Sequence, residues 1–160
     1  MIETNKIDVL ILEAISKGVS ELESQHQEFE SAKSSYIEDL EKQTNKFKEI
    51  AKKVEPIINF LKENGYTFSD SNNAFTTSEG AILAVTNEHI YCYTHGELVD
   101  KYQKYNLNKS EKIMISQALS EIQFSVAVKG LLDVLNVQKK AINQVLRKHQ
   151  MLIDDFESLK

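Results

Sequence analysis

The most reactive side chains of this 160-residue chain lie close together, at His89, Cys92 and His95. Two imidazoles and a thiol are the kind of ligands that zinc prefers. The segment alternates like a β-strand, however, and in a strand six residues separate the two histidines by about 20 Å. Cys92 also falls on the opposite face from both histidines. We therefore predict that these residues hold no metal, and the sequence indicates no cofactor.

Three other patterns that could support catalysis or ion binding are incomplete. Asp70, Asn72 and Glu79 resemble a calcium loop, but Ala74 occupies a ligand position and the required glycine is missing. The five glycines are scattered and form no phosphate-binding loop. A nucleophilic Cys92 would need a base and a third orienting group, which the sequence does not indicate. These observations favour a non-enzymatic protein, with an enzyme of unrecognised type as the third hypothesis.

Four aromatic side chains share one face of the same strand, namely His89, Tyr91, Tyr93 and His95. Tyrosine is enriched in protein interfaces because it combines a large apolar ring with a polar hydroxyl. One hypothesis is that this face binds a protein partner. The alternative is that a helix or a second subunit covers it.

These residues belong to a segment, 64–108, in which the apolar residues repeat with the period of β-strands. Residues 80–86 and 89–96 flank Asn87 and Glu88, a spacing typical of a two-residue β-hairpin. Residues 66–69, 74–77 and 98–105 could add further strands. We expect a small antiparallel β head, a hairpin or a meander, between two helical arms.

The first arm, residues 1–63, is expected to be one long helix. Positions separated alternately by three and four residues keep one register for seven heptads, which is typical of a coiled coil. Gly65 predicts the end of the helix, and Pro56 predicts either a kink or a break followed by a short new helix. The seam positions, twelve of fifteen apolar, are Leu12, Ile15, Val19, Leu22, His26, Phe29, Lys33, Tyr36, Leu40, Gln43, Phe47, Ile50, Val54, Ile57 and Leu61.

The second arm, residues 109–160, is expected to be another long helix. Asn108 and Glu111 resemble a capping box at its start, and only Gly130 interrupts the residues that follow. A second seam with the same spacing predicts a second coiled-coil helix. Its positions, nine of eleven apolar, are Phe124, Val128, Leu131, Leu135, Gln138, Ile142, Val145, His149, Leu152, Phe156 and Leu159.

Besides Gln43, four polar residues interrupt these two seams: His26, Lys33, Gln138 and His149. In an antiparallel hairpin of the two arms, the numbers of facing residues sum to about 172, so the interruptions lie at similar heights. We predict a polar layer in which His26 and His149 lie within about one helical turn of each other. Protonation of both imidazoles would then make the layer sensitive to pH. The alternative is that each histidine is a partly solvated seam residue.

Composition excludes several classes of protein. A net charge of −5 and an isoelectric point near 5.4 argue against nucleic-acid binding. The most apolar stretch, residues 124–137, is too short and too charged to span a bilayer, and Glu13 ends the apolar run at Val9–Leu12 too early for a signal peptide. A single cysteine fits a reducing compartment. We expect a cytoplasmic protein that is not attached to a membrane.

The sequence thus predicts a mostly helical α+β fold, in which two long antiparallel coiled-coil-like helices flank a small antiparallel β head as one structural unit. The apolar faces are too broad for two helices alone, so a homo-oligomer is expected, with a dimer favoured. The function expected is protein–protein interaction, as a scaffold, an adaptor or an inhibitory or regulatory binding protein. The alternative is a sensor that binds a small ligand in or beside the β head.

Overall fold

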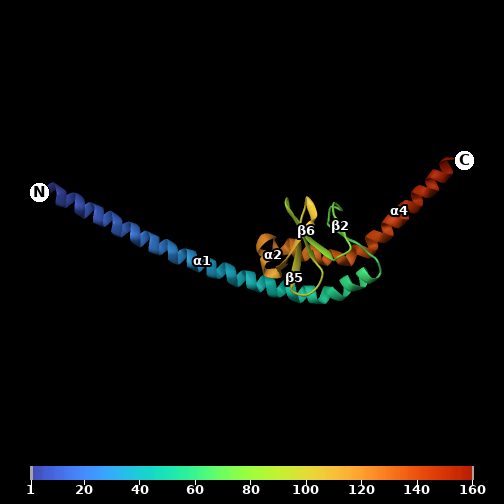
Figure 1. Ribbon diagram of the computed structural model, residues 1–160, viewed down its shortest axis with the longest axis horizontal. Coiled ribbons are helices and arrows are strands. Elements are labelled where there is room, and N and C mark those ends of the chain that lie inside the picture. Colours follow the sequence, from blue (N-terminus) through green and yellow to red (C-terminus); the bar gives the residue numbers. More distant parts are fainter. Residues whose placement is uncertain (1, 160) are drawn as a thin grey trace. The chain divides into compact units, whose positions relative to one another are not determined.

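A computed structural model describes residues 2–159 of the chain, with side chains described from residue 5 onward. Met1 and Lys160, the end residues of the two expected arms, lie outside this range. The fold is α+β, with a long N-terminal helix, a four-stranded antiparallel sheet and a C-terminal helix, as predicted (Figure 1). The chain divides into two compact units, the first ending at Glu41 and the second beginning at Lys42.

The first helix, α1, covers Ile2–Glu63 without a break, so Pro56 lies inside it. The helix ends just before Gly65, as predicted. Gly65 adopts a positive φ of 75°, a left-handed conformation that does not continue the helix. There the amide of Tyr66 donates to the carbonyl of Leu61 at 3.0 Å, and the amide of Gly65 donates to that of Lys62 at 3.1 Å. These two bonds form a Schellman motif, which satisfies carbonyls that the helix end would leave unpaired.

The sheet follows α1 and consists of β3 (Ala81–Val85), β4 (His89–Tyr93), β5 (Leu98–Gln103) and β6 (Asn106–Met114), paired in that order. The predicted hairpin at residues 80–96 is confirmed, and the amide of Thr86 donates to the carbonyl of His89 across its turn at 2.8 Å. Two short strands, β1 (Phe68–Ser69) and β2 (Thr76–Thr77), form a separate ribbon. The expected β head therefore exists.

The β head is longer than expected and the second arm is shorter. Asn108 and Glu111 lie within β6, because this nine-residue strand pairs with β5 along its length and that pairing replaces the predicted helix cap. The helical part is also divided, into α2 (Ile115–Glu121), α3 (Phe124–Leu132), the short 3-10 helix η1 (Asp133–Asn136) and α4 (Val137–Ser158). The uninterrupted helix predicted for residues 109–160 is thus wrong.

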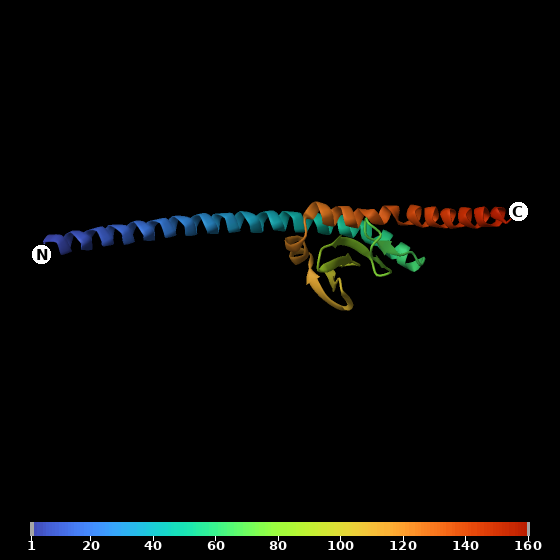
Figure 2. The same cartoon turned by 90° about the horizontal axis from the view of Figure 1, so that it is seen from above.

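The predicted antiparallel pairing of the arms is also wrong for the unit that begins at Lys42. Both views show the chain advancing in the same direction along residues 42–63 of α1 and along α3 and α4 (Figure 1, Figure 2). The reason is that the sheet, including the unexpected strand β6, carries the chain back before α2 begins. His26 lies in the first unit and His149 in the second, and their pairing stays a prediction.

In this unit a buried stripe of α1 contacts the sheet. The ring of Phe47 meets that of Tyr93 edge to face, with centroids 6.1 Å apart. The buried stripe consists of Thr44, Phe47, Ala51, Val54, Ile58 and Leu61. It coincides with the predicted seam at three positions and is shifted by one residue at the other three, because the helix presents a slightly rotated face to the sheet.

Candidate functional site

The strand that carried the predicted recognition patch faces the interior of the fold. Tyr91 and Tyr93 are 3% and 1% exposed, whereas His89 is half-buried and His95, after the strand, is exposed. The two tyrosine rings therefore lie in the core, as in the alternative considered above. Partner binding through His89 and His95 stays a prediction.

Tyr93 joins the sheet to α1. Its hydroxyl donates to the carbonyl of Gly96 at 3.1 Å and lies 3.3 Å from a carboxylate oxygen of Glu55. Burial, and then the negative charge of Glu55, raise the pKa of Tyr93 to about 12. The phenol thus stays neutral at physiological pH and serves as a hydrogen-bond donor.

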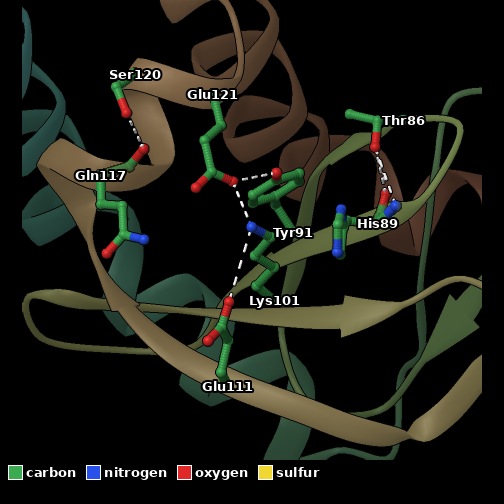
Figure 3. Close-up of polar contacts among 8 residues, drawn as sticks. All are labelled: Thr86, His89, Tyr91, Lys101, Glu111, Gln117, Ser120 and Glu121. Atoms are coloured by element: carbon green, nitrogen blue, oxygen red, sulfur yellow. Dashed lines mark hydrogen bonds and ion pairs between the residues drawn. The ribbon is translucent and has the colours of Figure 1, made fainter.

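Tyr91 belongs to a cluster of polar groups that connects β4, β5 and α2 (Figure 3). Its hydroxyl donates to Glu121, which also accepts a hydrogen bond from Lys101 at a nitrogen–oxygen distance of 2.7 Å. Lys101 lies 5.8 Å from the centre of the Tyr91 ring, and Glu111 is a more distant partner at 3.7 Å. Sequence reasoning missed Lys101 and Glu121, because α2 reaches this side of the sheet only after the unexpected strand β6.

The electrostatics of this cluster fit a structural ion pair. Burial, and then the hydrogen bond to Glu121, raise the pKa of Tyr91 far above its ordinary value. Burial alone would raise the pKa of Glu121, but hydrogen bonds from Lys101 and Tyr91 outweigh it and lower that pKa. Each charge is therefore stabilised by a neighbour.

Several cavities adjoin the sheet. One of about 320 Å³ lies beside β3, α3 and residues 69–72. A polar one of about 510 Å³ lies beside Lys101 and is lined also by His89, Gln103, Asn108, Lys109, Ser110 and Glu111. A smaller apolar one of about 160 Å³ lies between the β1–β2 ribbon and the sheet, lined by residues that include Phe75, Ile82, Ile90, Cys92 and Tyr102. The smaller cavity has the size that accepts a single aromatic ring. A small-ligand sensor stays a prediction.

Cys92 lines this apolar cavity, and its thiol is protonated at physiological pH. Its side chain is 1% exposed, and burial followed by the charge of Asp100 raises its pKa to about 12. Across residues 2–159, no group of three or more histidine, cysteine or acidic side chains is arranged to hold a metal ion. The four residues of the predicted polar seam layer, His26, Lys33, Gln138 and His149, are all exposed on helices.

Glu121→Gln tests whether the cluster stabilises the fold. The pKa of Glu121 is lower in the folded state than in the unfolded state, where it is near 4.5. The carboxylate therefore contributes to the free energy of unfolding above pH 4.5, and this contribution is lost as the pH falls through the pKa of the folded state. We expect the substitution to reduce the free energy of unfolding by about 1 kcal/mol at pH 7, since the carboxylate is partly exposed. The difference from the unsubstituted protein should shrink below pH 4.5 in urea titrations.

Glu111→Gln is the matched control for this prediction. Glu111 is 64% exposed and lies farther from Lys101, so its loss should change stability by only a few tenths of a kcal/mol. Equal effects of the two substitutions at pH 7, or a Glu121 effect that does not depend on pH, would contradict the prediction.

No family, curated protein or solved structure matches the chain. None of the helices within residues 2–159 combines the length and the apolar character that crossing a bilayer requires.

Proposed function

We propose that the protein is a non-enzymatic interaction module that associates with itself through its helices and carries the sheet as a rigid attachment. The observation that carries the proposal is the number of large apolar side chains exposed in the first unit. Eleven of them, between residues 7 and 37, are each at least 49% exposed: Ile7, Val9, Leu10, Ile11, Leu12, Ile15, Val19, Leu22, Phe29, Tyr36 and Ile37.

The energy of such exposure supports association. Burying one large apolar side chain stabilises a protein by roughly 1.5–3 kcal/mol. A contiguous apolar stripe of this length on a soluble chain is typical of an interaction surface. The spacing of three and four residues fits a helix–helix seam, in which each side chain inserts between residues of a partner helix.

The polar cluster supports the non-enzymatic part of the proposal. Lys101 and Glu121 neutralise each other, and the hydroxyls of Tyr91 and Tyr93 are held in hydrogen bonds. Together with the protonated thiol of Cys92, these groups give the sheet a stabilised core. A scaffold, an adaptor or a regulatory binding protein requires such a rigid sheet and an exposed helical surface.

Two double variants test the proposal. Leu22→Asp with Phe29→Asp places charges on the stripe, and Ser20→Asp with Ser31→Asp adds the same charge at exposed positions outside the seam. We expect the first pair to raise the dissociation constant of the oligomer at least 100-fold, since loss of two buried side chains costs roughly 3–6 kcal/mol. The control pair should change it less than tenfold.

Light scattering and sedimentation over a range of concentrations measure these constants. The unsubstituted protein should be a dimer or a larger species at micromolar concentration. A monomer under these conditions, or equal effects of the two double variants, would refute self-association through this stripe.

A further inference from the structure

A second exposed apolar stripe, which begins in η1, follows α4 and ends at its C-cap Leu159, matches the first in number of positions and spacing. The α1 stripe has eight seam positions, at residues 12, 15, 19, 22, 26, 29, 33 and 36, and the second has eight at residues 135, 138, 142, 145, 149, 152, 156 and 159. Both advance by the same alternation of three and four residues. The apolar members of the two stripes are all between 49% and 82% exposed.

We propose that residues 12–36 of α1 pack antiparallel against residues 135–159 of a second copy, with the numbers of facing residues summing to 171. This inference rests on the proposed self-association and names its partner and register. Every seam position then meets a seam position of the other helix, and Lys33 faces Gln138, whose amide oxygen can accept a hydrogen bond from the ammonium group. The adjacent layers, Phe29 with Ile142 and Tyr36 with Leu135, enclose this polar pair.

Charge distinguishes this arrangement from its alternatives. Residues 18–32 contain four acidic and no basic residues, and all four acidic side chains are exposed. In the antiparallel register they face residues 139–153, which contain four basic and no acidic residues, although Lys140 also pairs with Asp133 of its own chain. The same helices in parallel would face residues 141–155, whose charges cancel. Two α1 helices in parallel would place four acidic residues against four, which is repulsive.

The proposal assigns the facing helix to a second copy. An antiparallel pair needs two segments that run in opposite directions. A second copy can approach in either direction. If each copy supplies both stripes, two equivalent contacts close a symmetric dimer.

Disulfide formation between two variants tests the register. Val19→Cys and Leu152→Cys, mixed in equal amounts and mildly oxidised, should form a disulfide between positions 19 and 152, because a bridge requires Cα atoms about 4.4–6.8 Å apart. Val19→Cys mixed with Ile142→Cys is the matched control, since residue 142 would face residue 19 only in the parallel register. The native Cys92 should form no disulfide, because it is buried and its pKa is raised to about 12.

Peptide mapping by mass spectrometry should find the 19–152 bridge between chains at least tenfold more often than the 19–142 bridge. A reversal of charge adds a second readout: Lys139→Glu with Lys148→Glu should weaken association at least tenfold, and Glu23→Lys with Glu30→Lys on the partner should restore it. Bridges mainly between two residues 19 would overturn the pairing with α4 while leaving self-association intact. In a double variant that carries both Val19→Cys and Leu152→Cys, a 19–152 bridge formed mainly within one chain would overturn the second copy. A monomer by light scattering would overturn the proposed function as well.

Discussion

Phe47→Ala is expected to reduce the free energy of unfolding of the unit beginning at Lys42 by about 3–5 kcal/mol. Phe47 is 0% exposed and its ring packs edge to face on Tyr93, which links α1 to the sheet. The truncation removes buried apolar surface and the aromatic contact, and it leaves a cavity between α1 and the sheet. The surrounding helix and strand cannot close the resulting cavity, because other buried side chains hold their spacing.

Urea denaturation followed by near-ultraviolet circular dichroism of the tyrosines measures this loss. Phe29→Ala is the matched control, because Phe29 is 60% exposed and lies in the first unit. At concentrations that keep the chain monomeric, the control should alter the unfolding of the second unit by less than about 0.5 kcal/mol. A loss below 1 kcal/mol for Phe47→Ala would contradict the packing of α1 on the sheet.

The first helix and the hairpin were predictable because their signals are local. Seven heptads without a change of register specify a helix. Gly65 specifies its end, because glycine adopts the left-handed backbone conformation of a helix C-terminus at little cost in energy. The Thr86–His89 turn likewise follows from the spacing between two apolar runs. Pro56 remained ambiguous in sequence, because a proline in a helix either distorts it or starts a new one, and packing on the sheet decides between these outcomes.

The second arm could not be predicted correctly because its start depends on a distant partner. Residues 106–114 carry few apolar side chains, with only Ile113 buried, so neither their pattern nor their composition indicates a strand. Backbone hydrogen bonds to β5 stabilise it instead. After this unexpected strand, α3 and α4 run in the same direction as residues 42–63 of α1, within the second unit (Figure 1, Figure 2).

The candidate site shows the same limit. His89, Tyr91, Tyr93 and His95 were recognisable as one face of a strand, but sequence spacing cannot decide whether that face is covered. Burial is decided by α1 and α2, which contribute Glu55 and Glu121 from positions 38 and 30 residues away from their tyrosine partners. Only the fold brings these carboxylates to the phenols.

Gly130→Ala is expected to reduce the free energy of unfolding of the second unit by about 3 kcal/mol. In an exposed helix this change would stabilise the protein by up to about 1 kcal/mol, since glycine is a poor helix former. Here, however, α3 lies directly on β3 at the irregularity between Ile82 and Ala84. An added Cβ would meet the carbonyl oxygens of Leu83 and Ile82 at 2.4 and 2.6 Å, and backbone atoms cannot rotate away as a side chain can.

Gly18→Ala provides the matched control, because a Cβ at Gly18 meets nothing within 4 Å. The two substitutions add the same methyl group to a helix, so their effects should have opposite signs: Gly18→Ala should increase helicity and Gly130→Ala should lower the urea midpoint. Hydrogen exchange should locate the second effect, with faster exchange of the amides in β3 and α3 than in β6. A Gly130→Ala protein as stable as the unsubstituted one would mean that the helix does not rest on the strand backbone, because no rearrangement of side chains alone can accommodate an atom so close to two carbonyl oxygens.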